Sequence, residues 1–299
     1  MVARMTLEAP LGGPRAGLDA VTPPEPARSR ASELRLRIAS GIVMVAASLA
    51  LTWAGGWWFG GLVAAASAIM CWEWGRLARG ADSGLDRCLA LHAVVVVAVV
   101  VLTLSGHPGW GFAILLPGML ALHLFDNQRP LTPFGLAYVG VPALVMVWLR
   151  REPDYGLAAI LYLFLAVWVT DIAAYAAGRT FGGPKLAPSI SPGKTWSGLA
   201  GGVAMSGLAG AAFGAFVPGG SAVRLGFLAV VLALAAQIGD LAESALKRRS
   251  GLKDASGLIP GHGGLLDRVD GLVAAVAVVA ALVVLRHADA PARGLMLGL

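Results

Sequence analysis

Long apolar runs separated by short polar or Gly/Pro-containing breaks constrain this chain more than any other feature. A helix that crosses the hydrocarbon core of a bilayer needs roughly 20 mostly apolar residues. Somewhat shorter runs also suffice where the flanking side chains reach the membrane interface. Nine runs are candidates on this basis, at residues 36–53, 57–74, 89–104, 110–125, 134–149, 157–177, 198–217, 223–243 and 271–285. In lipid a helix satisfies its own backbone polar groups. The sequence therefore predicts an all-α, polytopic integral membrane protein with about nine transmembrane helices.

The composition excludes several other classes. Hydrophobic residues make up 57% of the chain and charged residues only 13%, whereas soluble domains are about 45–50% apolar even with glycine included. The two cysteines have no partner pattern for a disulfide framework or a metal site. The net charge of +6 is scattered over short loops, so we expect no nucleic-acid partner. Membrane lipids and a phosphorylated substrate fit this charge better.

The distribution of Lys and Arg predicts the orientation. With the N-terminus in the cytoplasm, eighteen of the 23 Lys and Arg residues fall on the cytoplasmic side and five on the other, as the positive-inside rule requires. The predicted regions are a disordered basic, Pro-rich arm at 1–32, N-terminal membrane helices at 33–155, and a C-terminal catalytic membrane region at 156–290. Within the last region, loops 178–197 and 244–270 are both predicted to be cytoplasmic.

Charged residues concentrate between the last two predicted spans. Asp240, Glu243, Ser244 and Lys247 follow one another at helical spacing, which places them on one helix face. A carboxylate near hydrocarbon is costly, so it is usually paired, solvated in a cavity or functional. A structural ion-pair network is the alternative for any single carboxylate, but it explains the whole set less well.

A second pair of carboxylates, Asp267 and Asp270, lies three residues apart where the last span begins. The turn before it, with His262, Gly263 and Gly264, is predicted to leave backbone N–H groups free for an anion. Carboxylates from two helix ends, close to Lys and Arg side chains, suit a hard divalent cation that also binds phosphate oxygens. The pattern lacks the ligands that zinc prefers.

The loop at 178–197 is a second basic element. Ser191, Lys194 and Thr195 look like part of a P-loop, but the first glycine of that motif is replaced by Pro188. We expect these side chains to contact a phosphate without a P-loop; the alternative is that the loop only anchors the protein at the membrane surface. Asp171 is predicted to line the same cavity, whereas Glu73, between two tryptophans, is predicted as a residue of the membrane interface.

The C-terminal half resembles the phosphatidate cytidylyltransferases, also called CDP-diacylglycerol synthases. Their signature is matched, with its internal spacings, by Ser244-Ala-Leu-Lys247-Arg248, Lys253-Asp254, Pro260-Gly-His262-Gly263-Gly264 and Asp267-Arg268-Val-Asp270. Gly239-Asp240, Glu243-Ser244 and Ser191-Pro192 with Lys194-Thr195-Trp196 add to the match. Gly193 and Ser197 stand where the family usually has Lys and Glu. The N-terminal half matches only as a run of membrane helices.

The resemblance implies that the protein converts CTP and phosphatidate into CDP-diacylglycerol and pyrophosphate. It implies a metal site of Asp240 and Asp267, with Mg²⁺ as cofactor, and allows a second cation. The implied catalytic residues are Asp240, Asp267, Asp270 and Lys247. The implied substrate-binding residues are Ser191, Lys194, Thr195, Ser244, Arg248, Lys253, His262, Gly263, Gly264, Arg268 and Asp171. The enzyme is expected in the cell membrane, an inner membrane in a bacterium, with its active site facing the cytoplasm; a homodimer is allowed.

Two other functions are compatible with part of these sequence features. A CTP-dependent polyprenol kinase, or a cytidylyltransferase for another phospholipid, would use the same architecture on another substrate. An ion-coupled transporter would use Asp171, Asp240 and Glu243 as a cation path. The polar residues gather on one side of the membrane rather than at its midplane, which argues against a transporter.

Overall fold

The computed structural model describes residues 30–80, 83–84, 86–126, 129–259 and 263–298, with side chains from residue 39 onward. Most of the predicted N-terminal arm and His262 lie outside the described residues. The described elements, in chain order, are α1 (Arg30–Ala54), α2 (Gly56–Arg79), α3 (Arg87–Leu104), α4 (Pro108–Phe125), α5 (Leu131–Arg151), α6 (Gly156–Phe181), β1 (Lys185–Ala187), β2 (Ser191–Thr195), α7 (Trp196–Phe216), α8 (Ala222–Arg249), α9 (Leu266–Arg286) and α10 (Pro291–Leu297).

The helices follow the predicted apolar runs. Seven of the described helices, α3 to α9, are long and apolar enough to cross a membrane, so the prediction of an all-α polytopic membrane protein is confirmed. Helices α1 and α2 cover the two remaining predicted runs. Several helices extend further than the predicted runs; among them, α6 continues to Phe181 and α8 to Arg249. The polar stripe that begins at Asp240 is therefore helical throughout.

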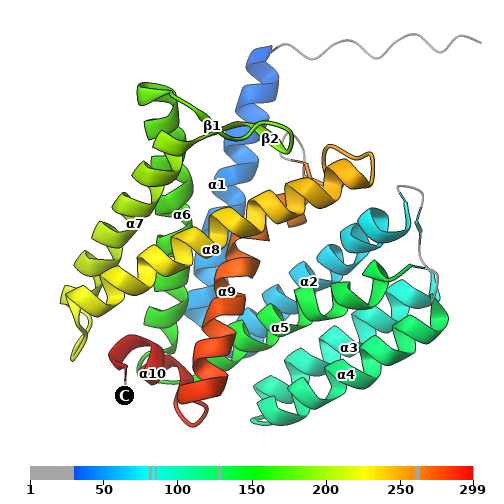
Figure 1. The fold of residues 1–299 in the computed structure, drawn as a ribbon. Helices are drawn as coiled ribbons and strands as arrows, with labels where there is room; N and C mark the ends of the chain where they lie inside the picture. Colours follow the sequence, from blue (N-terminus) through cyan, green and yellow to red (C-terminus); the bar gives the residue numbers. More distant parts are fainter. Residues whose placement is uncertain (1–29, 81–82, 85, 127–128, 260–262, 299) are drawn as a thin grey trace, which may run out of the picture.

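The helices form two groups joined by α9 (Figure 1). Helices α2 to α5 pack against one another, and α7 packs between α6 and α8. Helix α9 contacts α5, α6 and α8 and also reaches α2. Helix α9, whose first turns carry Asp267 and Asp270, is thus the element through which both groups can influence the same residues.

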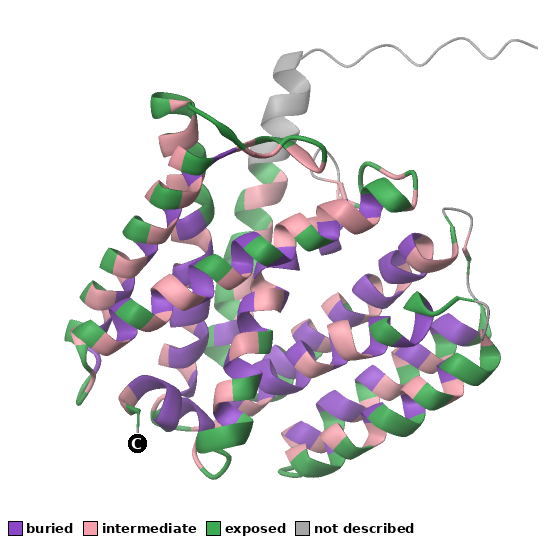
Figure 2. Ribbon diagram, viewed as in Figure 1, coloured by how far each residue is buried: buried purple, intermediate pink, exposed green. Residues whose placement is uncertain are grey.

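Buried residues line the contacts between the helices, and exposed residues lie on their outer faces (Figure 2). The interior is filled by large aliphatic side chains such as Leu144 and Leu163, both 0% exposed. Large apolar side chains also point outward, including Ile42, Leu116 and Phe227. Such a surface suits lipid, because hydrocarbon chains solvate apolar side chains that water would not.

The predicted loop at 178–197 contains a hairpin that the sequence did not indicate. Strands β1 and β2 pair antiparallel, and the chain enters them from α6 through Gly182 and Gly183, whose φ angles are +61° and +97°. Side chains other than glycine rarely adopt such angles. At the far end, the Thr195 hydroxyl accepts a hydrogen bond from Gly198 N and caps α7. The hairpin and the segment before α9 lie at the same end of the bundle (Figure 1).

Candidate active site

A cavity of about 770 Å³ opens where the hairpin meets α6, α8 and the start of α9. This volume is typical of small-molecule sites. Its lining is polar and charged: the acidic side chains are Asp171, Asp240, Asp267 and Asp270, and the basic ones are Arg179, Lys185, Lys194 and Arg268. Both predicted segments contribute to this cavity, 178–197 through residues such as Lys194 and 244–270 through Asp267 and Asp270 at the start of α9.

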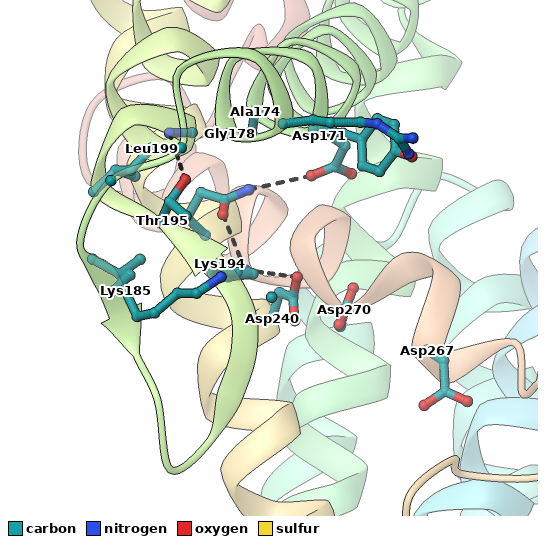
Figure 3. A pocket seen from close by; sticks show the side chains of 18 of the residues that line it. Asp171, Ala174, Gly178, Lys185, Lys194, Thr195, Leu199, Asp240, Asp267 and Asp270 are labelled. Carbon is teal, nitrogen blue, oxygen red and sulfur yellow. Dashed lines mark hydrogen bonds and ion pairs between the residues drawn. The ribbon is translucent and has the colours of Figure 1, made fainter.

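A chain of hydrogen bonds crosses the cavity from α6 to the hairpin (Figure 3). Gln237 Nε2 donates to Asp171 Oδ1 at 3.2 Å, and Gln237 Oε1 accepts from Lys194 Nζ at 3.0 Å. Lys194 Nζ also forms an ion pair with Asp240 Oδ2 at 2.7 Å. Gln237 is buried, with 6% of its surface exposed. Its amide therefore fixes the position of Lys194, which joins the hairpin to α8.

Two carboxylates on different helices face the same part of the cavity. Asp240 and Asp270 interact electrostatically, and Asp171 interacts with both. Asp240 and Asp270 lie side by side, while Asp267 lies apart from them (Figure 3). Asp240 also accepts a hydrogen bond from Ser244 Oγ at 3.2 Å. Like charges at this proximity favour a cation between them.

The donor set fits Mg²⁺ on chemical grounds. In the part of the chain that the structure describes, no three His, Cys, Asp or Glu residues converge on one point. Mg²⁺ is commonly held by only one or two protein carboxylates and takes its other ligands from substrate phosphates and water. The carboxylates of Asp240 and Asp270 meet that need, and the neighbouring basic side chains leave room for phosphate charge.

Asp267 is engaged differently from the other acidic residues of the cavity. Its Oδ1 pairs with Lys247 Nζ at 2.6 Å, and its Oδ2 accepts from Gly264 N at 2.8 Å and Ala255 N at 3.0 Å. Lys247 also pairs with Glu243 at 2.5 Å. Lys247 therefore links α8 to α9, and its ammonium group forms ion pairs with two buried carboxylates.

The glycine turn before α9 binds the protein's own carboxylates. Gly264 N donates to Asp267, while Leu265 N and Leu266 N donate to Glu73 at 2.9 and 2.6 Å. The prediction that the N–H groups of this turn stay free for a substrate anion is wrong for Gly264, because the Asp267 carboxylate already accepts from its N–H. Glu73, predicted at the membrane interface, is instead fully buried at 0% exposure.

The structure gathers part of the predicted site in the cavity and leaves part outside it. Predicted residues that line the cavity are Asp171, Lys194, Thr195, Asp240, Asp267, Arg268 and Asp270. Predicted residues that the structure describes elsewhere are Ser191, Ser244, Lys247, Arg248, Lys253, Gly263 and Gly264. Thr195 lines the cavity, but its hydroxyl already caps α7.

Four polar lining residues are absent from the predicted site: Tyr175, Arg179, Lys185 and Gln237. Gln237 had a recognisable signal: it is an amide in an apolar helix, three positions before Asp240, and so on the same helix face. Arg179 and Lys185 belong to the loop at 178–197, which was predicted as a basic element without a role for either residue. Only the hairpin and the end of α6 bring them over the cavity.

Comparison with known proteins identifies a family for this chain. Residues 35–286 match the model of a family described as the cytidylyltransferase family. A phosphatidate cytidylyltransferase of Brucella suis biovar 1 is 41% identical over 249 residues, covering 82% of this chain and 92% of that protein. Proteins of the same name are 34% identical in Haemophilus influenzae, over 81% of this chain and 96% of the relative, and 35% identical in Pseudomonas aeruginosa, over 76% and 88%.

Proposed function

Because this chain belongs to the cytidylyltransferase family and is a nucleotidyltransferase, we propose that it transfers the cytidylyl group of CTP to phosphatidate. The products are CDP-diacylglycerol and pyrophosphate. The observation that carries the proposal is the cavity lined by four aspartates and four basic side chains at one end of an apolar bundle. Such a site can bind phosphates in water while the acyl chains of a lipid stay in the membrane.

The chemistry asks little of a general base. A phosphate monoester is already an anion at neutral pH, so its oxygen can attack the α-phosphorus of CTP directly. The bond from that phosphorus to the bridging oxygen breaks, and pyrophosphate leaves with the electron pair. Catalysis then rests on positioning and on neutralising phosphate charge. Lys194, Arg268, Lys185 and Arg179 are the side chains of this cavity that can neutralise it.

Gln237 and Asp240 would control where the Lys194 ammonium stands. Both contact Lys194 Nζ, at 3.0 and 2.7 Å, from positions three residues apart on one helix. A lysine held by two partners loses less rotational freedom when it meets a phosphate. We expect Lys194 to bind the phosphate that is closest to α8.

The carboxylates that would hold Mg²⁺ are Asp240 and Asp270, with Asp267 as a third candidate. Asp267 has to give up its contact with Lys247 before it can bind a cation, because its oxygens already accept from Lys247, Gly264 and Ala255. When bound, the ion would withdraw charge from the phosphate oxygens and orient them.

We place this cavity on the cytoplasmic side of the membrane, with the N-terminus inside and nine spans. The support is the excess of Lys and Arg on that side, eighteen of 23, under the positive-inside rule. CTP would then arrive from the cytoplasm. The exposed apolar side chains of α6, such as Ile172 next to Asp171, would contact lipid beside the cavity.

A direct assay tests the proposal. Purified protein in lipid nanodiscs is incubated with labelled CTP, phosphatidate and Mg²⁺, and the products are separated into lipid and water phases. We expect a lipid-linked nucleotide and pyrophosphate in equal amounts, and loss of both when a chelator is added. An isoprenoid alcohol in place of phosphatidate should give no product. If phosphatidate gives no lipid-linked nucleotide, the proposed function is wrong; if the chelator has no effect, only the metal assignment is.

A further inference from the structure

Glu73 is a buried carboxylate of the N-terminal half that no step above uses. It lies on α2, is 0% exposed, and accepts three hydrogen bonds from the segment that leads into α9. The donors are Ser256 Oγ at 2.5 Å, Leu265 N at 2.9 Å and Leu266 N at 2.6 Å. A buried charge is tolerated only when it is paired or well hydrogen-bonded. Here both carboxylate oxygens are satisfied by a segment far along the chain.

These bonds serve a need of α9 itself. The first N–H groups of a helix have no partner within the helix, and α9 has no capping side chain at its own N-cap, Leu265. Glu73 supplies the missing acceptor from another helix. Its negative charge also favours the positive end of the α9 dipole. The start of α9 therefore takes its position from α2.

The glycine of the turn fits the same contact. A Cβ atom at Gly264 would lie 2.6 Å from Glu73 Oε1 and 3.0 Å from Ser256 N, closer than side chains normally approach. Gly264 N meanwhile donates to Asp267. Because Gly264 has no side chain, the Glu73 carboxylate can approach this turn closely on one side while the turn donates a hydrogen bond to Asp267 on the other.

Two further contacts bind the end of α2 to the same segment. Arg76 Nε donates to Ala255 O at 3.0 Å, and Ser250 Oγ donates to Leu77 O at 2.7 Å. Ala255 N in turn donates to Asp267. The last turns of α2 thus contact the segment at its beginning, its middle and its end.

We propose that Glu73 is a positioning residue for nucleotidyl transfer, which fixes the first turn of α9 and thereby the Asp267 and Asp270 carboxylates. The inference rests on the proposed function for its activity readout. Its structural half, that Glu73 holds the start of α9, stands without it. Glu73 touches neither cavity nor substrate, so its effect passes through the helix that it caps.

The experiment compares Glu73→Gln with His92→Gln. His92 is a matched control: it is buried at 2% exposure, and its ring nitrogens contact Cys88 O at 2.8 Å and Thr132 O at 3.1 Å, joining α3 to α5 away from the cavity. We expect Glu73→Gln to lower kcat roughly 10- to 100-fold, as small misplacements of reacting groups do, with little change in KM. His92→Gln should lower the unfolding temperature but leave kcat unchanged. Equal effects of the two variants on kcat would overturn the proposal.

Hydrogen exchange separates this inference from the proposed function. In Glu73→Gln the amides of Leu265 and Leu266 should exchange faster than in the parent protein, while those in the middle of α6 stay as protected. This readout needs no substrate, so it holds even if the protein acts on another lipid. Unchanged exchange at both amides would refute the capping contact itself.

A double substitution tests the shared turn. Gly264→Ala alone should lower kcat, because its Cβ meets the Glu73 carboxylate. In a Glu73→Ala background the same change should add less than about threefold, since contacting residues are non-additive. If the fold-changes in kcat of the two single substitutions multiply in the double variant, the two residues act independently and the proposal is wrong.

Discussion

The two groups of helices that meet at α9 are packed by different means. In the group of α6, α7 and α8, glycines bring backbones together. A Cβ at Gly202 would lie 2.8 Å from Thr170 O, and one at Gly210 would lie 2.7 Å from Leu225 O. Small residues at helix contacts are typical of membrane bundles, because close backbones gain van der Waals contacts that lipid cannot provide.

In the group of α2 to α5, glycines instead make room for large side chains. Gly135 lies under the ring of Trp74, and Gly118 lies against Leu136. Trp74 stacks on Tyr138, with ring centroids 4.9 Å apart. Side chains can adjust where backbones cannot. The comparison teaches that the cavity belongs to the group with close backbones, while the other group reaches it through the contacts of α2.

The largest expected effect comes from removing charge in the first group. Asp240→Asn should lower turnover by about 100-fold or more, the scale seen when one electrostatic group of an active site is lost, because Lys194 and the proposed cation both lose their carboxylate. Asp126→Asn, which changes a carboxylate of the α2–α5 group, should stay within about twofold. Steady-state product formation measures both, with membrane insertion checked by fractionation. Activity retained in Asp240→Asn would remove its role.

A smaller effect is expected from the amide that joins the hairpin to α6 and α8. Gln237→Leu removes hydrogen bonds to Lys194 and Asp171, and bonds to charged groups contribute about 1.5–3 kcal/mol. We expect kcat/KM to fall roughly 10- to 100-fold. Thr103→Val removes a buried hydroxyl of α3, which donates to Val99 O at 2.7 Å, and should leave kcat/KM unchanged. Equal loss in both variants would make Gln237 an ordinary structural residue.

The smallest effect tests the packing contrast itself. Gly210→Ala should lower the free energy of unfolding by about 1–3 kcal/mol, as overpacking does, because Leu225 O belongs to a backbone. Gly60→Ala meets the side chain of Leu104, which can rotate away. Alanine gains about 1 kcal/mol of helix propensity at either site, so the difference between the two variants isolates packing. Equal destabilisation, measured by denaturant titration, would show that the two groups do not differ.

Much of the fold follows from the sequence because membrane helices are specified locally. Each apolar run contains its own reason to be a helix, and all nine predicted runs are helical. The ends were less predictable: nothing in an apolar pattern indicates that α6 continues to Phe181, whereas the helical spacing from Asp240 to Lys247 did indicate that α8 continues past its apolar run. The hairpin was missed because its strands are three and five residues long and are too short to show alternation.

The candidate site was predictable where residues stand close together in the sequence. The sequence indicated Asp240, Asp267 and Asp270 because they are carboxylates at the ends of apolar runs. It did not indicate Glu73, because the groups that satisfy it are 183 to 193 positions away. The resemblance implies Lys247 as a catalytic residue, but in the structure it pairs with Glu243 and Asp267. Which partner a charge takes depends on tertiary packing, and spacing along the chain does not record it.

The matched numbers of acidic and basic side chains in the cavity have a consequence for what can enter. Four aspartates face four cations there, and Lys194 is already neutralised by Asp240. A naked polyphosphate would upset this balance, whereas one accompanied by its own counter-ion would preserve it. Under the proposed function, a nucleotide that brings its own cation would therefore disturb the charges of the cavity less than a free nucleotide, and the formal charges of the cavity leave no positive excess for anionic headgroups.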